Sequence, residues 1–145
     1  MSGKAVAQSL TLEFNLSHPP AKVWRALTEP ELLAKWLMAN DMEPVIGHRF
    51  TFKVDMKPTP RWDGIVHCEV QAIEVHKRLR YSWRGGPLDT VVTWTLEETS
   101  AGGTVLRLEQ SGFRLGEGQT VFFDGAKSGW QYKGDRLVDV LGNLA

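Results

Sequence analysis

The last quarter of the chain, from Thr120 to Ala145, carries apolar residues at helical spacing. Seven positions are separated by steps of three and four residues, which places them on one face of a helix. They are Phe123, Ala126, Trp130, Gly134, Leu137, Leu141 and Leu144. A helix from Phe122 to Leu144 would be roughly 34 Å long at 1.5 Å per residue. That length is enough to cross a sheet of about seven strands, which lie about 4.8 Å apart.

The seven-residue repeat alone could indicate a coiled coil. The run holds fewer than four heptads, however, and glycine stands at positions 125, 129, 134 and 142, which argues against that structure. The apolar face is therefore predicted to point into the protein, partly as core and partly as one wall of a cavity. Gly134 lies on this face, and a helical glycine costs about 1 kcal/mol relative to alanine. Either open space or a tight contact between helix and sheet would explain it.

The preceding sequence contains segments in which apolar and polar residues alternate, as expected of strands with one buried face. The expected strands cover residues 10–16, 50–56, 63–76, 79–83, 90–96 and 104–113. Short turns, such as Ser100 to Gly103, separate the later strands and indicate an antiparallel meander. In the third strand the apolar phase slips after Ala72 to Ile73 and Val75, which predicts a β-bulge or bend near Ala72.

Two short helices are expected between the first two strands. Ser17 is a candidate N-cap for a helix with Pro19–Pro20 in its first turn. The segment Thr28-Glu29-Pro30-Glu31 matches a capping box and predicts a second helix. Because strands and helices are segregated along the chain, the predicted class is α+β, with residues 1–145 as a single domain.

Composition excludes several classes of partner. The 145 residues contain 17 Lys+Arg and 17 Asp+Glu, so there is no basic excess to favour nucleic acid or an anionic membrane. Met1 to Gln8 lacks the apolar core of a signal peptide, and no apolar run approaches the ~20 residues that span a bilayer. The one cysteine, Cys68, excludes an internal disulfide and fits a reducing compartment. The predicted location is cytoplasmic.

Motifs along most of the chain, from about Leu10 to Leu144, resemble the START-like (SRPBCC) superfamily. The opening motif is Pro20-x-x-Val23-Trp24-x-Ala26-Leu27-Thr28-x-Pro30-Glu31, followed by Trp36. Later landmarks are Arg78-Leu79-x-Tyr81-x-Trp83, Val92-x-Trp94-x-Leu96, Gly103-Thr104-x-Leu106-x-Leu108, Ser111-Gly112 and Gly129-Trp130. The branch that the chain resembles most is the group similar to the activator of the ninety-kilodalton heat-shock-protein (Hsp90) ATPase. This resemblance implies a helix-grip fold, in which a curved antiparallel sheet wraps the C-terminal helix around a hydrophobic cavity.

One position departs from the pattern of the group. Relatives commonly have His-Ser-Gly at the end of the sixth strand, where this chain has Gln110-Ser111-Gly112. A role that needs a titrating imidazole is therefore excluded there, although Gln110 can still hydrogen-bond a polar ligand group. The co-chaperone role of the named activator does not transfer, because that protein carries an additional N-terminal domain.

Catalytic and metal-binding patterns are weak. The four histidines are scattered, and His67 and Cys68 would point to opposite faces of a strand, so no metal site is predicted. Gln110-Ser111-Gly112 and Lys127-Ser128-Gly129 lack the setting of a nucleophile elbow. The glycines from Gly112 to Gly118 lack the lysine of a phosphate loop, and Gly116–Gly118 is expected to form a lid before the last helix. No catalytic residue and no cofactor are predicted.

Aromatic residues on inward faces are the best indication of a binding site, although core packing would need them equally. The candidate ligand-binding residues are Phe52, Tyr81, Trp83, Trp94, Gln110, Phe123, Trp130 and Gly134. Arg80 is expected to point to solvent. The entrance would lie near Pro58–Pro60 and Gly116–Gly118, between helix and sheet.

Three functions remain open at this point. The first is non-enzymatic binding of a small hydrophobic molecule in the cavity, which is the default use of an apolar concave site. The second is an enzyme of the cyclase, aromatase or hydrolase type, whose acid or base would have to be Asp124, Tyr81, Glu69 or His67. The third is a protein-interaction module, with a chaperone contact or a homodimer, which would need an exposed apolar patch.

Overall fold

The computed structural model describes residues 7–53, 63–86, 88–114 and 120–144, with the side chains of α3 described from Asp124 onward. The elements in chain order are β1 (Ala7–Leu16), α1 (Pro20–Thr28), α2 (Pro30–Trp36), β2 (Ala39–Asn40), β3 (Arg49–Lys53), β4 (Ile65–Glu74), β5 (Arg78–Gly85), β6 (Leu88–Glu98), β7 (Thr104–Arg114) and α3 (Thr120–Gly142). This order confirms the predicted α+β class and helix-grip architecture.

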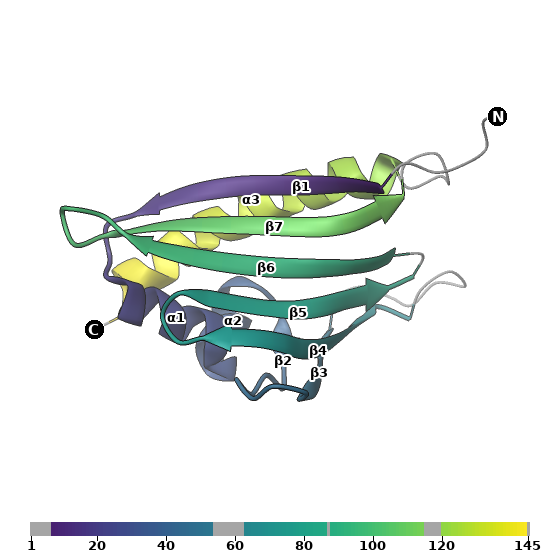
Figure 1. Ribbon diagram of the computed structural model, residues 1–145, viewed down its shortest axis with the longest axis horizontal. Helices are drawn as coiled ribbons and strands as arrows, with labels where there is room; N and C mark the ends of the chain where they lie inside the picture. The colour runs from purple at the N-terminus through teal and green to yellow at the C-terminus, as the bar shows by residue number, and fades with distance from the viewer. Residues whose placement is uncertain (1–6, 54–62, 87, 115–119, 145) are drawn as a thin grey trace.

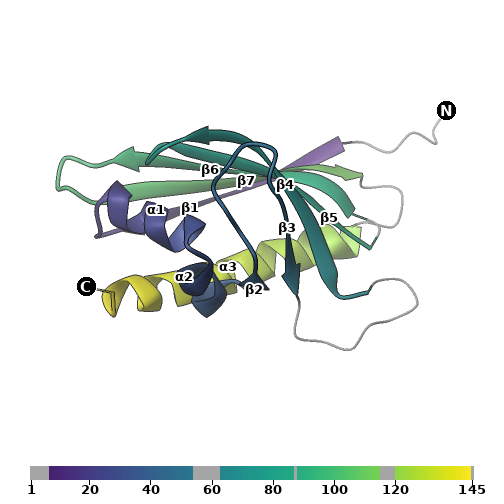
Figure 2. The same ribbon diagram turned by 90° about the horizontal axis from the view of Figure 1, so that it is seen from below.

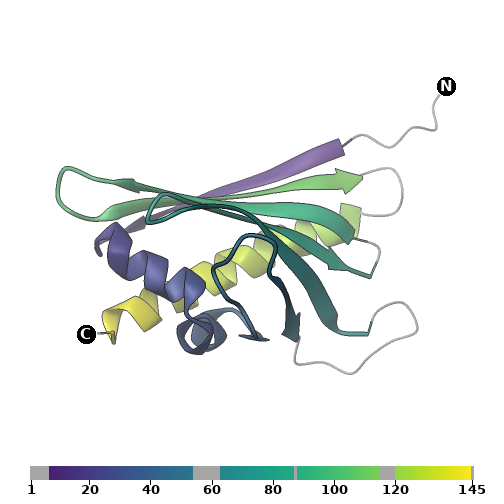
Figure 3. The ribbon, with the colours of Figure 1, turned by 60° about the horizontal axis from the view of Figure 1, so that its bottom comes forward.

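Seven antiparallel strands form one curved sheet in the order β1-β7-β6-β5-β4-β3-β2 (Figure 1). All three helices cover the concave face, and α1 and α2 lie beside the carboxyl-terminal half of α3 (Figure 2, Figure 3). The sheet strands follow one another as a meander except at the edge, where β1 pairs with β7. The core therefore lies between the concave face and the helices, as expected.

The predicted bulge in β4 is confirmed. The pairing of β4 with β5 shifts register between Val70 and Ala72, so one residue is inserted and the strand bends. Val75 was expected to continue the buried phase, and that prediction is wrong because its side chain is 62% exposed. The strand has already ended at Glu74, and the following turn places His76 at a φ of 65°.

Both predicted helix caps are wrong. The N-cap of α1 is Pro19 rather than Ser17, and its carbonyl oxygen accepts hydrogen bonds from the third and fourth residues of the helix. Thr28 does not cap α2, because its hydroxyl donates backward to the carbonyl oxygen of Trp24 at 2.8 Å. In both helices proline occupies the first position, where a backbone N–H would be unsatisfied in any case. Both helices therefore begin with a proline and without a side-chain cap.

The edge strand β2 was not predicted, because its two residues are too few for a periodic pattern. The strand expected at 50–56 is observed as Arg49–Lys53, and the rest of that prediction lies outside the described residues. The same holds for the expected turn at Pro58–Pro60 and for the lid at Gly116–Gly118. The long helix expected from Phe122 to Leu144 is confirmed as Thr120–Gly142.

The apolar face of α3 points at the sheet along its described length. Trp130, Leu137 and Leu141 are buried, whereas Ala126 and Leu144 are half-buried. The outward side presents Gly125, Gly129 and Tyr132 to solvent. The predicted inward orientation is thus confirmed for the described members of the stripe.

Two positively charged side chains of α3 also hydrogen-bond backbone carbonyl groups at the carboxyl-terminal end of α2. The ammonium group of Lys133 donates to the carbonyl oxygen of Leu37 at 2.9 Å, and Arg136 donates to that of Lys35 at 2.9 Å. Carbonyl groups in the last turn of a helix have no partner within the helix, and positive charge is favourable beside them. Burial, followed by the nearby charge of Arg136, lowers the pKa of Lys133. α3 therefore completes α2 as well as covering the sheet.

The tight-contact explanation for Gly134 is correct, and the open-space explanation is wrong. A Cβ atom at this position would collide with the ring of Phe14 on β1, coming within 2.8 Å of Cδ1 and 2.7 Å of Cζ. The glycine therefore lets the backbone of α3 approach the edge of the sheet.

Gly134→Ala is expected to destabilise the protein by about 1–3 kcal/mol, since the added methyl group overpacks the contact with Phe14. Chemical denaturation of the variant and the wild type measures this change. Gly129→Ala is the matched control, because nothing lies within 4 Å of the Cβ position there, and it should stabilise the helix by up to about 1 kcal/mol. Equal effects of the two substitutions would contradict the assignment.

Candidate functional site

The predicted site residues converge beneath the amino-terminal half of α3. Phe52 comes from β3, Tyr81 and Trp83 from β5, and Trp94 from β6. Each points to the concave side, because alternate residues of a strand share one face. Trp130 reaches down from α3 to meet them. The side chain of Phe123 is outside the described part of the structure, and Gly134 lies away from this cluster, against Phe14.

The rings pack directly against one another. The ring centroid of Trp130 lies 5.1 Å from that of Trp83 and 5.5 Å from that of Trp94, and Phe52 lies 5.3 Å from Trp83. These spacings fall in the range of favourable aromatic pairs, each of which contributes about 0.5–1.5 kcal/mol beyond burial. We call Phe52, Tyr81, Trp83, Trp94 and Trp130 the aromatic cluster. Its members are core residues in this conformation, with at most 8% of any side chain exposed.

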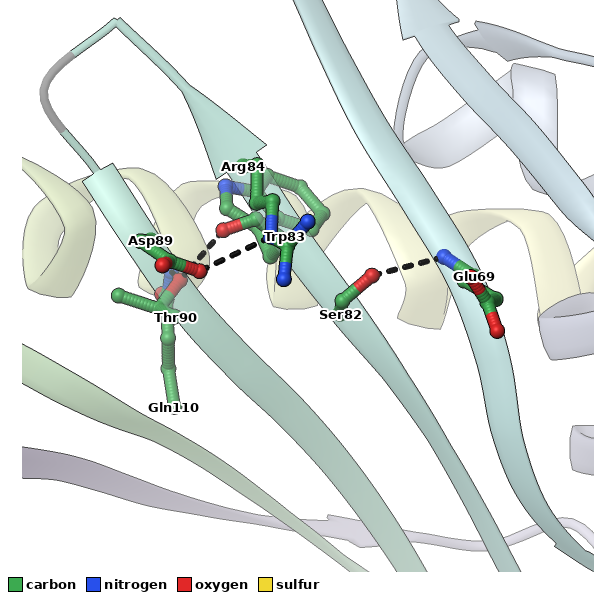
Figure 4. Close-up of polar contacts among 7 residues, drawn as sticks. All are labelled: Glu69, Ser82, Trp83, Arg84, Asp89, Thr90 and Gln110. Carbon is green, nitrogen blue, oxygen red and sulfur yellow. Dashed lines mark hydrogen bonds and ion pairs between the residues drawn. The ribbon is translucent and has the colours of Figure 1, made fainter.

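A directed hydrogen-bond relay ties α3 to the sheet through this cluster. The indole N–H of Trp130 donates to Oε1 of Gln110 at 2.8 Å, and Nε2 of Gln110 donates to the Thr90 hydroxyl at 2.9 Å. Thr90 in turn donates to the carbonyl oxygen of Trp83 at 2.8 Å (Figure 4). An indole can only donate and a carbonyl can only accept, so the two ends fix the orientation of the Gln110 amide. Gln110 is 1% exposed and acts as a connector between β7, β6 and α3.

Tyr81 and Trp94 form a second polar pair in the cluster. Nε1 of Trp94 donates to the hydroxyl oxygen of Tyr81 at 2.9 Å, and Tyr81 is 1% exposed. Burial raises the pKa of Tyr81, against the opposing effect of the hydrogen bond from Trp94. The hydroxyl therefore stays protonated at neutral pH and is a donor, not a phenolate.

The residues considered for enzymatic acid or base chemistry do not come together. Asp124 and His67 are exposed, and Glu69 is half-buried on the outer face of the sheet, where it pairs with Arg49. Within the residues that the structure describes, no group of three or more His, Cys, Asp or Glu side chains could hold a metal ion. Arg80 lies half-buried between the buried residues Leu79 and Tyr81, and its Nε atom is buried and has no partner among the described residues.

Surface grooves occur away from the aromatic cluster. One of about 540 Å³ lies between the start of α1, at Pro19 and Pro20, and the turn at His76 and Lys77. Another of about 400 Å³ lies on the outer face of the sheet, lined by polar residues that include Arg49, His67 and Arg84. Both are open to solvent, and neither is lined by a predicted site residue. The predicted site is defined by its interior rings and not by these grooves.

The family of the chain follows from a comparison with known families. Residues 17–142 match the family described as activator of Hsp90 ATPase homolog 1-like protein. The chain belongs to this family. The resemblance inferred from the tryptophan-rich motifs is therefore confirmed over nearly the whole sequence.

Solved structures of relatives share the fold. The crystal structure of protein MLL2253 from Mesorhizobium loti is 42% identical in sequence, with a TM-score of 0.84, and the match covers 95% of this chain and 99% of that one. The solution structure of protein BH1534 from Bacillus halodurans is 25% identical, with a TM-score of 0.76 and coverage of 95% and 99%. CalU16 from Micromonospora echinospora, at 21% identity, has a TM-score of 0.75 over 94% of this chain and 78% of that one.

These likenesses support the helix-grip fold, which is compatible with ligand binding. No curated protein matches the chain, so the relatives carry no function across to it. None of the described helices is long and apolar enough to cross a membrane. The relay through Gln110 was missed from the sequence because Thr90 and Trp130 each lie 20 residues from Gln110. Strand register brings Thr90 beside Gln110, and the docking of α3 brings Trp130 to it.

Gln110→Leu is expected to destabilise the protein by about 1–3 kcal/mol, because the Trp130 indole loses its acceptor while it stays buried. A double-mutant cycle with Trp130→Phe, followed by chemical denaturation, measures the coupling. Glu109→Leu serves as the control on the exposed face of the same strand and should change stability by less than about 0.5 kcal/mol. A coupling energy of zero would show that the relay does not hold α3.

Cys68 reports on access to the same interior. Its side chain is 5% exposed, and burial, with a smaller effect of Asp41, raises the pKa of the thiol. Since the thiolate is the reactive form, Ellman's reagent at pH 8 should modify the folded protein at least about tenfold more slowly than the unfolded protein. Rapid modification without denaturant would mean that this part of the core opens freely.

Proposed function

We propose that the protein binds a small, mostly apolar organic molecule between α3 and the sheet, beside the aromatic cluster. The observation that carries this proposal is the uneven spacing of the helix over the sheet. α3 packs closely on β1, α1 and α2, whereas opposite β5 and β6 the interval is filled by large rings, Trp83, Trp94 and Trp130. An interval filled by side chains can be opened by turning them, which a direct backbone contact does not allow.

Exchange of ring contacts makes binding energetically feasible. A flat apolar ligand that lies beside Trp130 replaces a ring–ring contact with a ring–ligand contact of similar energy. Additional apolar area removed from water contributes about 25 cal/mol per Å². The net affinity then comes from burial of the ligand and needs no charged group of the protein.

The polar groups of the concave face favour binding over catalysis. Those of the described residues that are buried there and near the cluster are Cys68, Tyr81, Thr90 and Gln110. Thr90 and Gln110 do not titrate, and burial raises the pKa of both Cys68 and Tyr81. Efficient general acid or base catalysis needs a group that titrates near the working pH. The four groups instead suit the orientation of a neutral ligand.

Titration with flavone and with palmitic acid tests the proposal. At least one of them should quench tryptophan fluorescence and raise the melting temperature, since a ligand at a hundred times its Kd stabilises the folded state by about 2.7 kcal/mol. Trp130→Phe should weaken the quenching and the affinity. Trp24→Phe is the matched control, because Trp24 contacts His76 and is not part of the cluster. Absence of quenching and of thermal stabilisation across lipid, flavonoid and polyketide ligands would refute the proposal.

A further inference from the structure

The hydroxyl hydrogen of Tyr81 is a buried donor without an assigned acceptor. Trp94 Nε1 lies 2.9 Å from the Tyr81 hydroxyl oxygen, and because an indole can only donate, this oxygen acts as the acceptor. The hydrogen of Tyr81 itself is therefore not used in that bond. Among the residues that the structure describes, no group accepts it.

Several other buried indole and hydroxyl donors near the cluster have acceptors. The indole of Trp36 donates to the carbonyl oxygen of Ala26 at 2.8 Å. Trp130 and Thr90 donate within the relay through Gln110. A buried polar group without a partner costs about 1–3 kcal/mol, and such exceptions call for a specific explanation. The Tyr81 oxygen has Trp94 as its partner, whereas its hydroxyl hydrogen is a strong buried donor that has no acceptor among the described residues.

The surroundings of Tyr81 select for a neutral acceptor. Its ring centroid lies 5.3 Å from that of Phe50 and 6.2 Å from that of Phe52. The other buried polar residues near the cluster are Cys68, Thr90 and Gln110, and none of them carries a charge at neutral pH. An unpaired carboxylate or phosphate would be strongly disfavoured there, whereas a carbonyl oxygen needs only one donor. The apolar rings on either side suit an aromatic framework next to that oxygen.

We propose that Tyr81 donates a hydrogen bond to a neutral carbonyl oxygen of the ligand, and that the ligand is therefore an aromatic ketone, ester or related carbonyl compound. This inference rests on the proposed function, because the ligand must reach the aromatic cluster. Tyr81 then determines specificity, while the rings supply most of the affinity. A ligand of the same size without the oxygen leaves the buried donor unpaired.

A pair of matched probes tests the inference, 2-acetylnaphthalene and 2-ethylnaphthalene, which differ by a carbonyl oxygen. The wild type should bind the ketone roughly three- to tenfold more tightly relative to the hydrocarbon than Tyr81→Phe does, as expected for one hydrogen bond. Infrared difference spectra give a direct signature. The carbonyl stretch of the bound ketone should move to lower frequency in the wild type and return toward its value in alkane solvent in Tyr81→Phe.

The other tyrosine of the chain supplies the control. Tyr132 is 61% exposed on α3, so Tyr132→Phe should keep both the ketone preference and the shifted carbonyl band. If both probes bind and neither the preference nor the band depends on Tyr81, the inference is overturned while the proposed function stands. If neither probe binds the wild type, the inference is overturned, and the lipid and flavonoid titrations decide the proposed function separately.

The carbonyl band of the wild-type complex keeps the inference testable even if Tyr81→Phe does not fold. Loss of the hydroxyl removes the acceptor of the Trp94 indole, so some loss of stability is expected in that variant. An unshifted band in the wild-type complex would overturn the inference without any variant.

Discussion

The contact between Gly134 and Phe14 sets the position of α3 over the sheet. At this point the helix backbone comes close enough to β1 that a single methyl group would collide with the phenyl ring. Further toward its amino terminus a tryptophan side chain of the same helix, Trp130, meets Trp83 and Trp94 of the sheet. The backbone of α3 therefore lies close to β1 at the edge of the sheet, and large side chains fill the space between α3 and the central strands β5 and β6. The aromatic cluster occupies that space.

Hydrogen bonds turn this packing into a defined geometry. Aromatic rings alone can slide past one another at little energetic expense, because their mutual attraction is broad. The relay from Trp130 through Gln110 and Thr90 fixes the rotation of one indole, and the bond from Trp94 to Tyr81 fixes another. Buried networks of this kind specify one arrangement when every member is satisfied. The pair of Trp94 and Tyr81 differs from the relay, because the hydroxyl hydrogen of Tyr81 has no acceptor among the described residues.

Periodicity predicted the strands, the long helix and the inward face of Trp130, because burial of one face leaves a repeating pattern in the sequence. It also predicted the bulge before Ala72, since a slip in the pattern must be absorbed by the backbone. The caps at Ser17 and Thr28 were mispredicted, because each helix begins with a proline that has no backbone N–H to cap, and neither start has a side-chain cap. The sequence did not decide why position 134 is a glycine, since the absence of a side chain is expected both beside a cavity and at a close contact between helix and sheet. Partners such as Gln110 and Trp130 depend on register and on docking, which local sequence does not encode.

The pairing of β1 with β7 has a consequence for how the chain acquires its structure. Leu10 lies opposite Gln110, so β1 finds its place in the sheet only after β7 has been made. Chains emerge from the ribosome amino terminus first, at about 5–20 residues per second. For several seconds β1 therefore has no β7 to pair with. Pairing between strands so far apart in the sequence is also slow to form. The edge strand β1 is therefore made early but is paired late, when β7 becomes available to it.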